Sequence, residues 1–148
     1  MTDCDYIIYT DGGGASSVVG GRAVAIKTKD GKTPIEILYR TNGNKMTCNE
    51  AEYTAVLLAL ERLEYHTKVK IYSDSMLIVN QLHPEKPWKI NFNHLKLLNS
   101  LIRDVIENLE LDVTFEYIPR DDNLAGLFLE GKLRADDNII HNVTEETS

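Results

Sequence analysis

The chain has 148 residues, 43% of them hydrophobic, and a formal net charge of -7. This length is typical of one domain with a single packed core. No apolar run reaches membrane-spanning length and no secretory signal opens the chain, so we expect a cytoplasmic protein without membrane contact. The two cysteines, Cys4 and Cys48, are expected as free thiols. The acidic balance argues against an extended nucleic-acid-binding face, although it leaves room for a local basic strip.

The first half of the chain reads as three strands followed by a buried helix. Alternating or clustered apolar residues predict strands at residues 5–10, 22–28 and 35–41. A glycine-rich loop covers 12–21, and Asp30-Gly31 indicates a type I′ turn between the second and third strands. Thr47-x-x-Glu50 has the capping-box pattern of a helix start. The segment 51–63 behind it is apolar nearly all round, which is typical of a helix buried on several sides.

In the second half, strands alternate with helices. A strand is expected at 68–73 and a short helix at 75–82, after which Pro84 and Pro87 make 83–90 a connector. We expect Asn93 to cap a long helix whose apolar stripe includes Leu95, Ile102 and Leu109. The remaining elements are a strand at 112–118, a loop at 119–123 and a helix at 124–133.

This order of elements predicts the fold class α/β. Hairpins make the first three strands antiparallel, whereas helix-connected strands lie parallel by the right-handed crossover rule. The expected architecture is a mixed five-stranded sheet with helices on both faces. We expect one domain at 1–134 and a polar, flexible tail at 135–148.

Three acids stand at a strand end or a helix start: Asp11, Glu52 and Asp74. If the first and fourth strands are parallel neighbours, Asp11 and Asp74 face one crevice, and Glu52 can reach it from its helix. Such carboxylates suit Mg²⁺ or Mn²⁺, and two ions could clamp both oxygens of a phosphoryl transfer. Taken singly, each acid has an ordinary explanation as a turn, helix-dipole or capping residue. Their occurrence together favours a metal-dependent enzyme.

The motifs Thr10-Asp11-Gly12, Asn49-Glu50-Ala51-Glu52 and Asp74-Ser75, in this order, resemble the ribonuclease H type 1 family over about 5–133. The resemblance implies an endonuclease that cuts the RNA strand of RNA–DNA hybrids, with Asp11, Glu52 and Asp74 as metal-binding catalytic acids. It implies that the backbone of Gly12, Gly13 and Gly14 approaches the RNA, that Asn49 contacts the minor groove and that Ser75 lies at the substrate. RNA would be distinguished by its 2′-hydroxyl.

The sequence departs from the family pattern near its end, because Gly126 stands where a fourth acid is expected. Three replacements are open. Glu130, one turn further, could reach back, although a solvated helix face explains it somewhat better. Asn123 could offer a carbonyl oxygen, or an acid of the loop, Asp121 or Asp122, could swing in.

The connector is short and resembles family members without the long basic handle. Lys86, Lys89 and Lys96, with Trp88 as a flat apolar surface, could follow the phosphates of the DNA strand. Alternatively, Trp88 packs the connector onto the core. Arg120 occupies a loop where relatives carry His or Arg, or it is an ordinary exposed arginine. We expect a monomer without a separate hybrid-binding module.

Two other functions fit the same sequence. One is a degenerate member that binds hybrids or protein partners without cutting, which Gly126 favours and the three retained acids disfavour. The other is a DNA-acting nuclease on the same fold, which the match at Asn49-Glu50-Ala51-Glu52 disfavours, since a fold does not fix a function.

Overall fold

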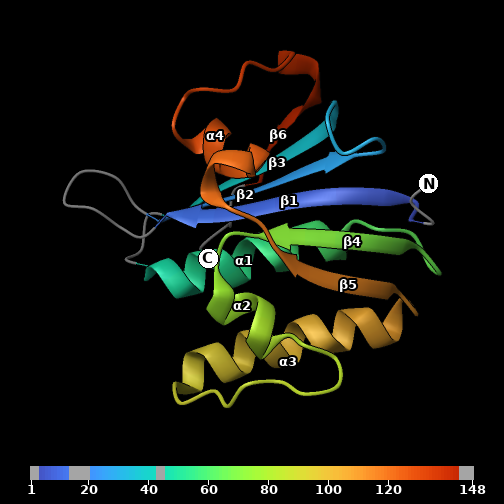
Figure 1. The fold of residues 1–148 in the computed structure, drawn as a ribbon, viewed down its shortest axis with the longest axis vertical. Helices are drawn as coiled ribbons and strands as arrows, with labels where there is room; N and C mark the ends of the chain where they lie inside the picture. The colour runs from blue at the N-terminus through green and yellow to red at the C-terminus, as the bar shows by residue number, and fades with distance from the viewer. Residues whose placement is uncertain (1–3, 14–20, 43–45, 144–148) are drawn as a thin grey trace.

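The computed structural model describes residues 4–13, 21–42 and 46–143, which form a mixed sheet with helices on both faces (Figure 1). The strands are β1 (Tyr6–Gly13), β2 (Gly21–Thr28), β3 (Pro34–Asn42), β4 (Lys68–Ser73), β5 (Asp112–Tyr117) and β6 (Ile140–Asn142). The helices are α1 (Cys48–Glu61), α2 (Met76–Gln81), α3 (Asn93–Asn108) and α4 (Leu124–Leu129), with 3-10 turns at Arg120–Asp122 and Asp137–Ile139.

The sheet has the order β5-β4-β1-β2-β3-β6. β1, β2 and β3 pair antiparallel, whereas β4 pairs parallel with β1 and β5 parallel with β4. The predicted α/β class and the mixed sheet are therefore confirmed. The parallel pairing of β1 with β4 is the feature that matters for function, because it brings the carboxyl ends of two strands to the same edge of the sheet.

The described sheet has six strands, where the sequence predicted five. The additional strand β6 pairs parallel with β3, and the backbone N–H of Val143 donates to Tyr39 O at 2.7 Å. Ile139 and Ile140 also pack against the apolar cluster between the sheet and α4. Part of the segment expected to be a flexible tail is thus held by a strand ladder and by apolar contacts.

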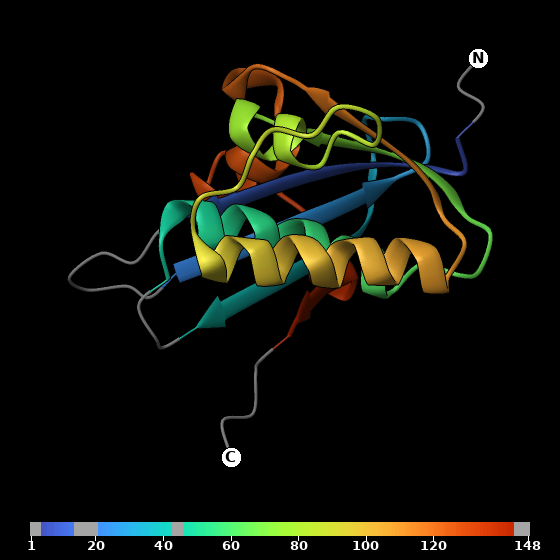
Figure 2. The same ribbon diagram turned by 90° about the horizontal axis from the view of Figure 1, so that it is seen from below.

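Alternating side chains give the sheet two apolar faces. Ile8 of β1 belongs to a cluster with residues of α1, whereas its neighbours Ile7 and Tyr9 belong to a second cluster with Ala125 of α4. Figure 2 shows α3 packed beyond α1 on the first face, and Figure 1 shows α4 on the opposite face. α1 therefore lies between the sheet and α3, which explains why its sequence is apolar nearly all round.

The start of α1 agrees with its predicted cap. The Glu50 N–H donates to Thr47 Oγ1 at 3.1 Å, and the Thr47 N–H donates to Glu50 Oε1 at 3.3 Å. This reciprocal pair satisfies two of the free amides of the first turn. The first turn of α1 carries Asn49, and Glu52 follows directly after it, so the cap fixes the start of the helix that supplies one of the three acids.

Three local predictions were wrong. α3 is preceded by Phe92 without a side-chain cap, so Asn93 is its first residue. Among described non-glycine residues only His66 and Glu110 have positive φ, so Asp30 does not adopt the type I′ conformation. Its Oδ1 instead accepts from the backbone N–H groups of Lys32 and Thr33. The last helix ends at Leu129 rather than at residue 133.

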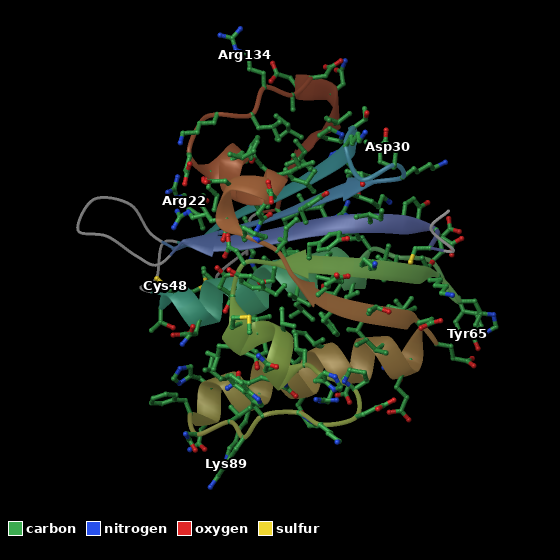
Figure 3. All side chains as sticks on the ribbon, in the orientation of Figure 1. Arg22, Asp30, Cys48, Tyr65, Lys89 and Arg134 are labelled. Carbon is green, nitrogen blue, oxygen red and sulfur yellow. The ribbon has the colours of Figure 1, made fainter. Side chains whose placement is uncertain are left out.

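No helix in the described part of the chain combines the length and the apolar character needed to cross a membrane. Both thiols are free, with Cys48 exposed at the start of α1 (Figure 3).

Candidate active site

Asp11 and Asp74 emerge side by side because their strands are parallel neighbours. Thr10 of β1 pairs with Ser73, the last residue of β4, and the residue that follows each of them in the chain is an aspartate. β1 continues past Asp11 to Gly13 and still pairs with β2 there, which makes it longer than the predicted strand. Asp11 is consequently fixed by a strand ladder, and Asp74 lies in the short link between β4 and α2.

Gly12 brings the third acid into place. A Cβ atom at this position would lie 2.3 Å from the backbone carbon of Ala51 and 2.5 Å from the backbone nitrogen of Glu52. Real Cβ atoms do not make such contacts, so only glycine lets the first turn of α1 approach β1 this closely. The close approach of the Gly12 backbone to the RNA, which the family resemblance implies, stays a prediction, and within the protein its neighbour is the backbone of α1.

The three carboxylates form one compact cluster. Asp11, Glu52 and Asp74 each offer an oxygen, and these oxygens lie within 4.8 Å of one another. Asp11 is 5% exposed and Glu52 is 8% exposed, whereas Asp74 is half-buried. The predicted convergence of the three acids is therefore present in the structure.

Burial raises the pKa of all three acids, and repulsion from a neighbouring carboxylate of the cluster adds to it for Asp11 and Glu52. Burial is the main cause for Asp11, and the negative charge of Asp74 adds to it. Burial followed by the charge of Asp11 raises the pKa of Glu52 to about 10. Burial also raises the pKa of Asp74, opposed by a hydrogen bond from Asn123 and by the charge of Arg120. The cluster therefore holds protons in the absence of another cation.

Glu52 Oε2 has no hydrogen-bond partner, and it is the one buried side-chain oxygen or nitrogen of which this is true among the described residues. A buried carboxylate oxygen without a partner is costly in a folded protein. Three convergent carboxylates, one with a free buried oxygen, have the donor set that hard divalent cations prefer. The residues present thus fit a divalent metal ion.

Asn123 holds Asp74 and β1 in position. Its Nδ2 donates to Thr10 O at 2.9 Å and to Asp74 Oδ2 at 3.3 Å, and its Oδ1 accepts from the Ala125 N–H at 3.1 Å. The side chain is fully buried. The carbonyl oxygen that was one candidate metal ligand therefore caps α4 instead, and the nitrogen faces the acid.

Gly126 faces the cluster from α4. A Cβ atom here would lie 3.4 Å from Asp11 Oδ2 and 3.7 Å from Asp74 Oδ2, both ordinary contact distances. The position where the family pattern expects an acid therefore borders the three carboxylates, and in this chain it carries no side chain. The described acidic cluster comprises only Asp11, Glu52 and Asp74.

Glu130 lies outside that cluster and is paired with two cations. Its Oε1 accepts from Arg120 Nε at 3.0 Å, and its Oε2 lies 3.1 Å from Lys132 Nζ. Asp121 and Asp122 are exposed in the 3-10 turn before α4. The Arg120–Glu130 pair was missed from the sequence, where only the opposite charges ten residues apart hint at it.

The residues predicted to contact substrate are scattered around the cluster. Asn49 lies half-buried in the first turn of α1, and Ser75 caps α2 through a hydrogen bond from the Ile78 N–H at 3.3 Å. A Cβ atom at Gly13 would meet the Arg22 side chain at an ordinary contact distance, 3.9 Å from Nη2. Gly14 lies outside the described residues.

The connector forms one wall of a groove of about 400 Å³ against α3. Trp88, Lys89 and Lys96 line it, and Trp88 is 52% exposed. Lys89 points away from the body of the molecule at the end of Figure 3 opposite α4. Lys86 is exposed on the same connector, and the Arg120 side chain is 69% exposed on the other side of the cluster.

The sequence model of the family described as RNase H matches residues 3–126. LC11-RNase H1, isolated from compost by a metagenomic approach and solved in complex with RNA/DNA hybrid, is 27% identical, with a TM-score of 0.68. The similarity covers 80% of this chain and 88% of that chain. No curated protein matches the sequence.

Two further solved structures show the same fold. The N-terminal RNase H domain of rv2228c from Mycobacterium tuberculosis has a TM-score of 0.72 at 23% identity, covering 88% of this chain and 94% of that one. RNase H1 from the halophilic archaeon Halobacterium salinarum has a TM-score of 0.68 at 22% identity, covering 85% of this chain and 98% of that one. The predicted RNase H-like fold is confirmed.

Proposed function

The chain belongs to the RNase H family as a type 1 member, and from this premise we propose that it hydrolyses the RNA strand of RNA–DNA hybrids in a reaction that depends on Mg²⁺. The predicted class of enzyme, a ribonuclease H, follows from the family match. The substrate, the cleavage and the ions are the content of the proposal, and Mn²⁺ is expected to substitute for Mg²⁺.

One observation carries the proposal: three acids from β1, α1 and the link after β4 meet within 4.8 Å, and one of their oxygens is buried without a partner. Holding like charges together without a counterion disfavours the folded state. Asp11, Glu52 and Asp74 would hold the metal. Two divalent ions, when bound there, would supply a lowered pKa for the attacking water and a positive charge for the leaving oxygen.

The other residues orient this site and its substrate. Asn123 restrains Asp74 through the hydrogen bond from its Nδ2 to Asp74 Oδ2. Arg120 places a positive charge beside Asp11 and Asp74, where a phosphate of the RNA strand would pass. We propose that Asn49, Ser75 and the backbone of Gly12, Gly13 and Gly14 contact the hybrid.

The DNA strand is proposed to follow the connector. Trp88 offers a half-exposed aromatic face, and Lys86, Lys89 and Lys96 offer charges to its phosphates. The net charge of -7 limits the attraction between the whole protein and a hybrid. Binding should therefore weaken steeply with salt, because it depends on a few local cations. We further propose a cytoplasmic monomer.

A cleavage assay tests the proposal. A labelled RNA–DNA hybrid, with duplex DNA and duplex RNA as controls, is incubated with the protein in Mg²⁺, in Mn²⁺ and in a chelator. We expect cutting of the hybrid RNA alone, lost in the chelator. Asp74→Asn should lower the rate by more than about 100-fold, because it removes one of three charges that hold the ions.

Three results would contradict the proposal. Tight hybrid binding with no cutting under any divalent ion would favour the degenerate, binding-only alternative, which the glycine at position 126 makes worth testing. Cutting of duplex DNA, with the hybrid left whole, would favour a DNA-acting nuclease. An Asp74→Asn protein as active as the unsubstituted protein would remove the acid cluster from the reaction.

A further inference from the structure

A buried polar network joins the three helices on one face of the sheet, and it does not include any of the three acids. Tyr53 of α1, Gln81 of α2 and Asn99 of α3 are 0%, 4% and 6% exposed. Polar side chains buried to this extent are stable only where they find hydrogen-bond partners. These three find their partners chiefly in one another.

The hydrogen bonds run from helix to helix. The Tyr53 hydroxyl donates to Gln81 Oε1 and accepts from Asn99 Nδ2 at 3.3 Å. Asn99 Nδ2 also donates to the backbone oxygen of Gln81 at 3.2 Å. Arg103 closes the network, since its Nε donates to Asn99 Oδ1 at 2.7 Å and its Nη2 donates to Gln81 O at 3.2 Å.

One end of the network lies beside the acids. Tyr53 directly follows Glu52 on α1, and α2, which ends at Gln81, begins two residues after Asp74. Glu52 faces β1 through the close contact at Gly12, and Tyr53 faces the other helices. The first turn of α1 is therefore fixed on one side by the sheet and on the other by the network.

The other end of the network is the floor of the connector groove. Gln81, Asn99 and Arg103 line this groove together with Trp88 and Lys89. The connector is attached to α2 at the same place, where the Trp88 N–H donates to Asn80 O at 2.9 Å and Gln81 Nε2 lies 3.5 Å from Lys89 O. Through Gln81, the wall of the groove is linked to the helix that carries Glu52.

We propose that Tyr53, Gln81 and Asn99 are positioning residues that fix the connector carrying Trp88 and Lys89 relative to the acid cluster. The inference rests on the proposed function for the identity of what the groove binds. A hybrid that spans the groove and the acids must meet both at one fixed separation. Loosening the network should therefore weaken binding of the hybrid more than it slows the reaction of bound hybrid.

Trp88 allows this inference to be tested without substrate, because it is the sole tryptophan of the chain. Two variants remove hydrogen bonds with little change of volume: Tyr53→Phe and Gln81→Met. Asn80→Ala is the matched control, since Asn80 also lies on α2 but its side-chain amide bonds only to Met76 O at 2.7 Å, within its own helix. Acrylamide quenching of Trp88 fluorescence, Mn²⁺ affinity and steady-state kinetics on a hybrid are measured for each.

We expect the acrylamide quenching constant and the KM to rise in both network variants, the KM by about 5-fold and with kcat within about 2-fold of the starting value. Mn²⁺ affinity should be unchanged in both network variants. The Asn80→Ala protein should match the unsubstituted protein in quenching, KM and Mn²⁺ affinity. A network that serves stability alone would lower the melting temperature and leave quenching and KM as in Asn80→Ala. That result would overturn the inference.

Tyr53→Phe removes a single oxygen atom, so it keeps the test available should Gln81→Met fail to fold. Failure of the proposed function is separate from failure of the inference. Raised Trp88 quenching in both network variants of a protein that cuts no hybrid would support the positioning role and contradict the proposed substrate. Unchanged Trp88 quenching in network variants of a protein that cuts the hybrid would contradict the positioning role and support the proposed substrate.

Discussion

Gly126 leaves the acid cluster with three carboxylates where the family pattern expects four. The helix α4 brings this position within ordinary contact distance of Asp11 and Asp74, and its backbone does not have positive φ. A side chain would therefore fit there, and its absence leaves one side of the carboxylate cluster without a ligand. Glu130, one turn along, is engaged with Arg120 and Lys132. We therefore expect the second ion of the proposed two-ion site to bind more weakly than the first.

Gly126→Asp should reverse that weakness. A fourth carboxylate near the cluster adds attraction for a divalent ion, and we expect about 10-fold tighter Mn²⁺ binding in the absence of hybrid. The same substitution should destabilise the metal-free protein, because it adds a fourth repelling charge. Calorimetric titration with Mn²⁺ measures the affinity, and thermal unfolding in a chelator measures the stability.

Gly126→Asn is the matched control, since it adds a side chain of the same size without the charge. We expect Gly126→Asp to bind Mn²⁺ more tightly and to be less stable without metal. We expect Gly126→Asn to show neither change. If both variants bind Mn²⁺ like the unsubstituted protein, position 126 does not border an ion site.

At the scale of elements, the contact between β1 and α1 decides whether Glu52 reaches the aspartates. Gly12→Ala would place a methyl group about where the α1 backbone lies. We expect a loss of about 3 kcal/mol or more in the free energy of unfolding, because backbone atoms cannot rotate out of the way as a side chain can. Gly13→Ala is the control, since its nearest neighbour would be 3.9 Å away. Urea unfolding of both variants measures the difference, and equal midpoints would contradict this account of Gly12.

β6 is the element that sequence patterns do not predict. A chain ending at residue 134 lacks β6, the backbone bond from Val143 to Tyr39, and the packing of Ile139 and Ile140. We expect it to be less stable than a chain ending at residue 143 by about 2–3 kcal/mol, on the basis of the partly buried apolar area and the exposed edge of β3. Chemical denaturation of the two truncated proteins measures the difference. Identical midpoints would support the domain boundary predicted at residue 134.

The elements that carry the acids were predictable because their signals are local. A capping box at Thr47 and Glu50 and strands ending near Asp11 and Asp74 can be read within a few residues. The role of Asn123 and the Tyr53–Gln81–Asn99 network could not be read in this way, because they join residues 18 to 113 positions apart. Such contacts depend on how the elements pack, and a short pair of isoleucines at 139 and 140 gives no strand pattern.

For the molecule as a whole, the acid cluster links stability to pH and to metal. Glu52 has an ordinary pKa of 4.5, and burial beside Asp11 raises it to about 10 in the folded protein. At a pH below the ordinary pKa, Glu52 is protonated in both the folded and the unfolded chain. At a pH between the two pKa values, Glu52 loses its proton in the unfolded chain and keeps it in the folded chain. Rising pH therefore favours unfolding. Asp11 and Asp74, whose pKa values are also raised, act in the same direction.

We therefore expect the free energy of unfolding of the metal-free protein to fall by about 2 kcal/mol or more between pH 5 and pH 9. By our proposal Mg²⁺ binds the ionised acids, and it should therefore stabilise the protein more at pH 9 than at pH 5. In a chelator, Glu52→Gln should reduce the fall in the free energy of unfolding between pH 5 and pH 9. Glu61→Gln removes an exposed acid from the same helix and should leave that fall unchanged. Urea unfolding across this range, with and without Mg²⁺, measures both effects. A decline that persists unchanged in Glu52→Gln would mean that other groups cause it and that the buried carboxylate is not held protonated.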